Sequence, residues 1–264
     1  MVPGWVARII RLGLGRAGYR IERVAGEQPS SDGYERVCPG ATFAPWVRDA
    51  EFTRVYEAIQ ESTLIDRYRC YELWQLIEQV RDTPGDVLEV GVWRGGSAAL
   101  IARKAAIEAP DATVYLADTF AGVVKAGGED SCYRGGEHAD AGESEVRALL
   151  AAVAPDRPVQ LLVGVFPEET ARQIPAEAIF RLCHVDVDVY QSARDVFRWV
   201  WPRVPAGGVV VFDDYGFPTC DGVAKFVDAE LRGRNDLVIV HNLNGHAVVV
   251  KTRAGSAAVA ARPA

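Results

Sequence analysis

Two pairs of carboxylates stand at the ends of apolar stretches. Asp186 and Asp188 end one such stretch, and Asp213 and Asp214 directly follow another at 209–212. If both stretches are neighbouring strands of a parallel sheet, their ends lie about 5 Å apart, at the edge where α/β sheets bind ligands. Carboxylates this close repel one another unless a proton or a cation neutralises them. We therefore predict that Asp186, Asp213 and Asp214 hold Mg²⁺ or another divalent cation. The role of Asp188 stays open, and the alternative is a set of helix caps.

A glycine-rich turn separates an apolar stretch from an alanine-rich one. Gly91 permits a tight turn, Gly95 and Gly96 let a ligand approach the backbone, and Ser97 could cap the following helix. The spacing differs from the G-x-G-x-x-G pattern of dinucleotide sites, and Glu89 precedes the turn. A pyrophosphate favours bare amides at a helix terminus, whereas an acid suits a positively charged ligand. The motif favours a cationic ligand over a pyrophosphate, and a plain strand-to-helix turn is the alternative.

A further acid, Asp118, ends the next apolar stretch, 113–117. An acid at this place in a doubly wound sheet can accept hydrogen bonds from both ribose hydroxyls of a nucleoside. The order strand, glycine turn, helix, strand, acid therefore predicts a nucleoside-type cofactor. The alternative is an aspartate that only caps the following segment.

Hydrophobic periodicity predicts the elements that would position these residues. Two helices are expected between 49 and 80, with a break at 61–66. Strands then alternate with helices, which is typical of an α/β fold with a mostly parallel sheet covered on both faces. The last two strands follow one another directly, which indicates a hairpin and one antiparallel strand. The expected strands are 87–90, 113–117, 159–163, 182–187, 209–212, 237–241 and 247–251, and the expected later helices are 97–107, 143–153, 192–200 and 222–231.

The composition argues against several classes of protein. The chain has 264 residues, 49% hydrophobic and 25% charged, which suits one large globular domain. A net charge of -7 gives no indication of a nucleic-acid partner, and no apolar run is long enough to span a membrane. Five cysteines without a C-x-x-C pair predict a reduced, cytoplasmic protein.

The chain is expected to divide into an N-terminal arm and loop at 1–48, a main domain at 49–253 and a flexible tail at 254–264. The stretch 1–24 mixes apolar residues with arginines and lacks the pattern of a signal peptide. Packing on the domain or on a partner subunit is favoured over an amphipathic helix on a membrane surface. The long, glycine-rich stretch 122–143 is interpreted as a lid over the site.

Four motifs taken together resemble the macrocin O-methyltransferase family, and the similarity runs in order from about Thr63 to Lys251. They are 89–97, 117–122, 186–192 and 213–216. The resemblance implies a class I methyltransferase, with a Rossmann-like doubly wound sheet and an N-terminal helical extension. It also implies S-adenosyl-L-methionine and Mg²⁺ as cofactors, a homodimer or larger homo-oligomer, and a sugar hydroxyl of a glycosylated secondary metabolite as acceptor.

The resemblance further implies roles for individual residues. Asp186, Asp213 and Asp214 would hold the metal. The cofactor-binding residues would be Glu89, Gly91, Gly95 and Ser97 around the glycine turn, Asp118 at the ribose, and Thr63 and Leu64 before the core.

These residues suggest a mechanism in which two neighbouring hydroxyls of a glycoside chelate the metal. The metal lowers the pKa of the reacting hydroxyl and orients it, and Asp186, or alternatively Asp188, accepts the proton. One alternative keeps the reaction and changes the acceptor to a catechol or another phenol. A non-catalytic binding module is disfavoured by the full set of acids, and a metal-dependent hydrolase or hydroxylase by the lack of a histidine-rich ligand set.

Overall fold

The computed structural model describes residues 33–35, 37 and 40–253. The predicted arm at 1–24 and the predicted tail at 254–264 lie outside the described residues. The described residues 41–253 belong to one compact unit, which holds every helix and strand given below.

The centre of this unit is a seven-stranded sheet in the order β3-β2-β1-β4-β5-β7-β6. Strands β1 to β5 pair in parallel, and β7 is antiparallel to both of its neighbours. The prediction of a mostly parallel sheet with a C-terminal antiparallel strand is thereby confirmed. The strands are β1 (Asp86–Val90), β2 (Val114–Asp118), β3 (Val159–Val163), β4 (Phe180–Val185), β5 (Val209–Phe212), β6 (Leu237–His241) and β7 (Ala247–Lys251).

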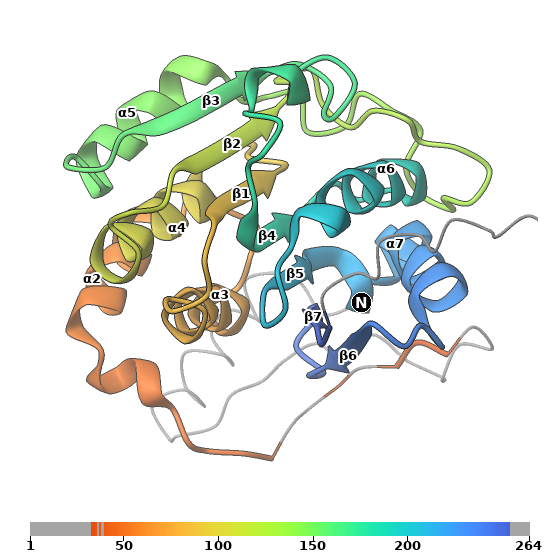
Figure 1. The fold of residues 1–264 in the computed structure, drawn as a ribbon, viewed down its shortest axis with the longest axis horizontal. Helices are drawn as coiled ribbons and strands as arrows, with labels where there is room; N and C mark the ends of the chain where they lie inside the picture. The colour runs from red at the N-terminus through yellow and green to blue at the C-terminus, as the bar shows by residue number, and fades with distance from the viewer. Residues whose placement is uncertain (1–32, 36, 38–39, 254–264) are drawn as a thin grey trace, which may run out of the picture. The chain divides into compact units, whose positions relative to one another are not determined.

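Helices cover both faces of the sheet, as Figure 1 shows. Helices α2 to α5 lie on one face and α6 and α7 on the other, and each group packs on the sheet through its own apolar cluster. Side chains on both faces of the central strands are therefore apolar, as expected for a covered parallel sheet. The helices are α2 (Ala50–Ile59), α3 (Arg67–Gln79), α4 (Gly96–Glu108), α5 (Glu143–Val153), α6 (Tyr190–Val200) and α7 (Asp221–Phe226).

The break predicted at 61–66 separates α2 from α3, and an aspartate fixes the start of each helix. The Asp49 carboxylate accepts a hydrogen bond from the backbone N–H of Phe52, at 2.9 Å. Asp66 accepts from the N–H groups of Tyr68 and Arg69, at 2.8 and 3.1 Å. Each carboxylate satisfies amides that have no partner inside the helix, so the loop between the helices has a defined end.

The structure differs from the predicted bounds by one or two residues at β1, β2, β4, α4 and α6, and it changes the kind of helix within 222–231. Strand β4 ends at Val185, earlier than the predicted 187, because the chain turns at Asp188, whose φ is 63°. This shorter strand leaves Asp186 in the turn. The helix predicted at 222–231 is α-helical only to Phe226 and continues as a π-helical turn at Val227–Leu231.

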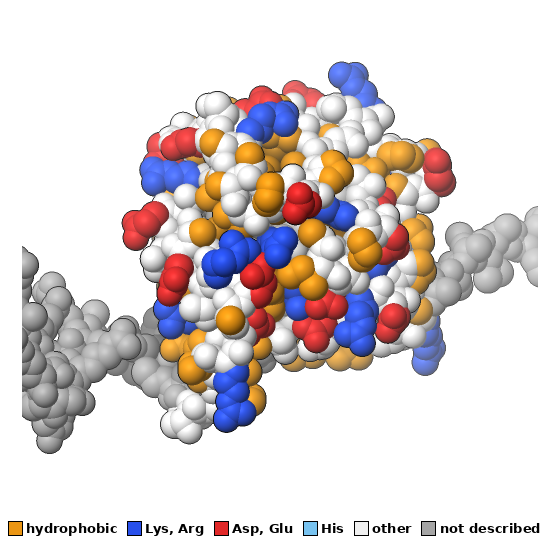
Figure 2. All heavy atoms as spheres, turned by 90° about the vertical axis from the view of Figure 1, so that its left-hand side faces the viewer, with side chains coloured by type: hydrophobic (Ala, Val, Ile, Leu, Met, Phe, Trp, Pro, Cys, Tyr) orange, Lys and Arg blue, Asp and Glu red, His pale blue; other side chains and the backbone are white. Residues whose placement is uncertain are grey.

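The surface on the side of α2, α4 and α5 mixes positive and negative side chains (Figure 2). Pairs such as Arg54 with Glu51, at 2.7 Å, and Arg103 with Glu51, at 2.6 Å, contribute to this mixture. None of the described helices has the length and apolar character needed to cross a membrane. Within the described part of the chain Cys70, Cys132, Cys183 and Cys220 are all free thiols.

Candidate active site

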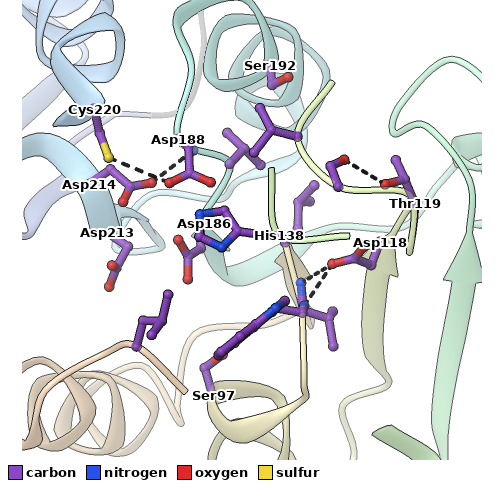
Figure 3. A pocket seen from close by; sticks show the side chains of 18 of the residues that line it. Ser97, Asp118, Thr119, His138, Asp186, Asp188, Ser192, Asp213, Asp214 and Cys220 are labelled. Atoms are coloured by element: carbon purple, nitrogen blue, oxygen red, sulfur yellow. Dashed lines mark hydrogen bonds between the residues drawn. The ribbon is translucent and has the colours of Figure 1, made fainter. Parts of the chain in front are cut away.

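A cavity of about 290 Å³ opens at the carboxyl ends of the parallel strands. Its wall is made by the loop before α3, the turns after β1, β2, β4 and β5, and part of the stretch 122–143. Figure 3 shows Asp118 on one side of this cavity and the carboxylates of Asp186, Asp188, Asp213 and Asp214 on the other. The fold thus brings both predicted acidic sites to one cavity, at the sheet edge where ligands of α/β proteins bind.

The Asp118 carboxylate links the turn after β1 to the end of β2 through hydrogen bonds. Its Oδ2 accepts hydrogen bonds from the backbone N–H groups of Val92 and Trp93, at 2.6 and 2.8 Å. Its Oδ1 accepts from the N–H of Phe120, at 2.7 Å. Three amide donors hold the carboxylate in one orientation at the cavity wall, which is the preorganisation that a ribose-binding acid needs.

Steric contacts that the sequence does not reveal require glycine in the turn after β1. Gly91 has a φ of 91°, and a Cβ atom built on it would lie 1.6 Å from the carbonyl oxygen of Asp186. Gly95, with a φ of 86°, is the residue before α4 and takes the capping position that we predicted for Ser97. That prediction was wrong because the helix already begins at Gly96, which places its N-cap two residues earlier than predicted. Ser97 is buried and lines the cavity.

The loop before α3 packs directly on the start of α4. The backbone N–H of Gly96 donates to the carbonyl of Ser62 at 2.9 Å, and a Cβ on Gly96 would lie 2.6 Å from that same oxygen. This contact brings Thr63 and Leu64 to the cavity wall, where the sequence prediction placed them. Leu64 stays 67% exposed, so its side chain is available to a ligand.

Glu89 and Gly95 do not lie on the cavity wall among the described residues. Glu89 is fully buried, and its Oε1 lies 2.9 Å from Nδ1 of His184. Its Oε2 has no hydrogen-bond partner within the described structure. The side chain thus reaches toward β4 in this structure, and a direct contact between Glu89 and a cofactor stays a prediction.

Asp186, Asp213 and Asp214 form the cluster that the strand order predicted. One carboxylate oxygen from each lies within 4.8 Å of the others. Burial and the neighbouring negative charges of Asp213 and Asp214 raise the pKa of Asp186 well above its ordinary value. Burial and the charges of Asp188 and Asp213 do the same to the pKa of Asp214. A divalent cation would relieve this repulsion, and three carboxylates are the donors that Mg²⁺ prefers, so the residues fit such an ion.

Asp213 differs from the other two acids because cationic and N–H groups surround it. Arg69 binds its Oδ2, and Nε2 of His246 lies 2.7 Å from its Oδ1. Burial alone would raise the pKa of Asp213, but the adjacent imidazoles of His184 and His246 and the charge of Arg69 hold it well below its ordinary value. Arg69 and His246 were not among the predicted site residues, because nothing in their local sequence indicates contact with Asp213.

Asp188 points to a different set of partners. Its Oδ1 accepts from the Cys220 thiol at 3.6 Å, and its backbone N–H donates to Oδ2 of Asp214 at 3.0 Å. Burial raises its pKa, although a hydrogen bond with Tyr133 opposes this. Asp188 therefore borders the cluster of Asp186, Asp213 and Asp214 without joining it, and Figure 3 shows its bond with Cys220.

The stretch 122–143 forms one wall of the cavity and is anchored on the α6 side of the sheet. The Asp130 carboxylate accepts from the backbone N–H of Tyr190, the first residue of α6, at 2.9 Å. Ser192 donates to the carbonyl of Val124 at 2.9 Å, and Lys125 pairs with Asp195 at 2.9 Å. These bonds hold the part of the stretch that would act as a lid, and they place Tyr133 and His138 at the cavity.

The geometry of Asp118 leads to a first testable prediction. In Asp118→Asn one of the three backbone N–H groups meets an amide NH₂ in place of an acceptor, so the free energy of unfolding should fall by about 1–3 kcal/mol. Urea denaturation measures this change. The control is Asp140→Asn, an exposed acid that binds Trp93 and Arg94, which should leave stability nearly unchanged. Equal stability of Asp118→Asn and the unsubstituted chain would contradict the organising role of Asp118.

Comparisons with known proteins agree with this geometry. The family described as Macrocin-O-methyltransferase (TylF) matches residues 57–241. The demethyldecarbamoylnovobiocin O-methyltransferase of Streptomyces niveus is 30% identical over 195 residues, which cover 67% of this chain and 72% of that protein. The mycinamicin III 3''-O-methyltransferase of Micromonospora griseorubida is 34% identical over 172 residues, 60% of this chain and 66% of that protein.

Solved structures give the same result for the fold. The structure of the O-methyltransferase NovP is 29% identical, with a TM-score of 0.57, and covers 73% of this chain and 83% of that chain. The calicheamicin methyltransferase CalS11 is 19% identical, with a TM-score of 0.60 over 80% of this chain and 94% of that chain. The latter similarity concerns the fold alone.

The sheet order, the glycine turn and the acid at the end of β2 define an O-methyltransferase with the class I fold. Within this class, the chain belongs to the macrocin O-methyltransferase family, whose match covers more than half of its length.

Proposed function

We propose that this enzyme transfers the methyl group of S-adenosyl-L-methionine to a sugar hydroxyl of a glycosylated small molecule, with a divalent cation at Asp186, Asp213 and Asp214. The observation that carries the proposal is the position of this acidic cluster, which shares one cavity with Asp118 and the glycine turn. The names of the relatives support the acceptor class, because mycinamicin III 3''-O-methyltransferase and a rhamnosyl-tetracenomycin 4'-O-methyltransferase are both named for methylation of a sugar position.

The residues on the β1 and β2 side of the cavity would bind the cofactor. Asp118 offers a fixed carboxylate at the cavity wall, which suits two ribose hydroxyls. Gly91 lies directly after β1 and Ser97 in the first turn of α4, and Thr63 and Leu64 close this side from the loop before α3. The cavity wall is mostly apolar with a few fixed polar groups, which is typical of sites for small molecules.

The residues on the β4 and β5 side would carry the chemistry. When bound, S-adenosyl-L-methionine supplies the methyl group, and a divalent cation lowers the pKa of a coordinated hydroxyl. Asp186, Asp213 and Asp214 would hold the cation through their carboxylate oxygens. A carboxylate oxygen of Asp186 would accept the proton of the acceptor hydroxyl, because Asp186 lines the cavity beside the other acids of the proposed cation site. Tyr133 and His138, on the wall formed by 122–143, would face the acceptor.

The proposal predicts a metal-dependent transfer to sugars. Calorimetric titration of S-adenosyl-L-methionine with and without Mg²⁺ measures cofactor binding, and a methyl-transfer assay on glycosides and catechols, with and without EDTA, measures the reaction. We expect cofactor binding in the micromolar range and transfer to a glycoside that EDTA abolishes and excess Mg²⁺ restores.

Each other outcome would change a separate part of the proposal. Transfer that is insensitive to EDTA would remove the cation and leave the acidic cluster with another role. Methylation of catechols but not of glycosides would change the acceptor class. No binding of S-adenosyl-L-methionine would contradict the proposed cofactor. The homodimer or larger assembly implied by the family is a separate proposal, which light scattering on the purified protein tests.

A further inference from the structure

Asp213 is held by side chains from three segments that are far apart in the sequence. Arg69 of α3 binds Oδ2, and two imidazoles face Oδ1. Nε2 of His246, after β6, lies 2.7 Å from Oδ1, and Nε2 of His184, in β4, lies 3.6 Å from it. The side chains of Asp213 and both histidines are at most 3% exposed. This carboxylate therefore has a fixed orientation and little exposure to solvent.

His246 is itself held by an acid on the opposite side of its ring. Its Nδ1 lies 2.5 Å from Oε2 of Glu72, in α3. Asn242 and Asn244, from the same β6–β7 turn as His246, also donate to the Glu72 carboxylate, Asn244 at 3.2 Å. Glu72 thus binds three side chains of the turn at 242–246. It sets the position and tilt of the His246 imidazole, which bonds Asp213.

The turn at 242–246 also packs directly on the segment that carries Asp213. The backbone N–H of Gly216 donates to the carbonyl of Gly245 at 2.8 Å. A Cβ on Gly245 would lie 2.6 Å from the ring of Phe217, and a Cβ on Gly216 would lie 2.7 Å from Cα of Gly245. The two backbones are therefore in contact, with no room for a side chain between them.

We propose that Glu72 and His246 are positioning residues that orient Asp213 for the divalent cation. Neither residue lies on the wall of the cavity within the described structure, so both act through Asp213 and not on a ligand. The inference rests on the proposed function, because it takes Asp213 as a ligand of the cation. Groups that orient a ligating side chain through a hydrogen bond change metal affinity by about 10–100-fold when they are removed.

Two substitutions at one position separate positioning from packing. In His246→Gln the side-chain amide can place an N–H near the position of Nε2, so the bond to Oδ1 of Asp213 is kept while the bond to Glu72 is lost. His246→Leu fills similar space and donates no hydrogen bond. Glu72→Gln keeps the shape of the side chain but removes its charge. Tyr215→Phe is the matched control, because the Tyr215 hydroxyl bonds Asp228 and Arg232, away from the cluster, although Tyr215 is only two residues from Asp213.

The Kd of Mn²⁺ is measured by electron paramagnetic resonance on the purified full chain without cofactor or acceptor. Thermal unfolding is measured in EDTA. We expect His246→Leu to weaken Mn²⁺ binding by about 10–100-fold, His246→Gln to recover part of this loss, and Glu72→Gln to cause a smaller loss than His246→Leu. Tyr215→Phe should bind Mn²⁺ like the unsubstituted chain even if its unfolding temperature falls.

Equal Mn²⁺ affinity of His246→Leu and the unsubstituted chain would overturn the positioning role, and so would equal losses in His246→Leu and His246→Gln. If the unsubstituted chain binds no Mn²⁺, the proposed metal site itself fails, and the positioning role fails with it. The first two results leave the proposed function intact, so the two kinds of failure are distinguishable.

Discussion

Replacement of Asp186 by asparagine should lower kcat by about 10³-fold, while the Kd for S-adenosyl-L-methionine changes little. The size follows from the loss of general-base catalysis, which contributes about 10²–10⁴-fold, and asparagine cannot accept the proton. Cofactor affinity should persist because the change is nearly isosteric and leaves Asp118 and the glycine turn untouched. Single-turnover kinetics with saturating Mg²⁺ and calorimetric titration of the cofactor give the two quantities.

Asp188→Asn is the matched comparison for this variant. Asp188 lies two residues from Asp186, accepts a hydrogen bond from the Cys220 thiol and donates one from its backbone N–H to Asp214. Its replacement should therefore lower kcat much less than the replacement of Asp186. A larger fall in Asp188→Asn would assign the base to Asp188, the alternative that the sequence left open. An equal fall in kcat and in cofactor affinity for Asp186→Asn would indicate that Asp186 has a structural role.

Replacement of Gly91 by alanine should lower the free energy of unfolding by at least about 3 kcal/mol. The variant would combine a buried steric clash with a strained backbone conformation. The new Cβ would stand 1.6 Å from the carbonyl oxygen of Asp186, and the φ of 91° disfavours any side chain. The ends of β1 and β4 would have to separate, and Asp186 would move with its backbone. For a domain of this size the unfolding temperature should fall by about 6–12 °C, as differential scanning calorimetry can measure.

The control for this variant is Gly128→Ala. Gly128 has no heavy atom within 4 Å of its built Cβ and no left-handed φ, so the unfolding temperature should stay within about 2 °C of that of the unsubstituted chain. If Gly91→Ala unfolds at the same temperature as Gly128→Ala, the close approach of β1 and β4 does not constrain this position. If Gly91→Ala folds but loses Mn²⁺ binding, the displacement of Asp186 would explain the loss.

The periodicity of apolar residues determined most of the fold. Strands β3, β5, β6 and β7 begin and end where the sequence predicts, because two-residue alternation or continuous apolar runs encode strands locally. The acidic cluster was also predictable. In a parallel sheet the residues after neighbouring strands meet at one edge, so Asp186 at the end of β4 and Asp213 after β5 had to approach one another.

Other features of the site depend on contacts that no local pattern encodes. Glu72 and His246 are 174 residues apart and Arg69 and Asp213 are 144 apart. Their bonds follow from how α3 packs against the β6–β7 turn and against the turn after β5. The direction of the Glu89 side chain, toward His184, likewise depends on the pairing of β1 with β4. The insertion of β7 between β5 and β6 could not be read from the order of elements, since a hairpin can join a sheet edge by either of its strands.

The sequence by itself therefore determined the fold class, the family motifs and the acids that meet at the sheet edge. These follow from local periodicity and from the geometry of parallel strands. Only the tertiary structure decided which groups surround each acid. It left Asp186 and Asp214 among like charges and surrounded Asp213 with Arg69 and two imidazoles. The physical reason is that burial and charge depend on neighbours in space, and those neighbours come from parts of the chain that are distant in sequence.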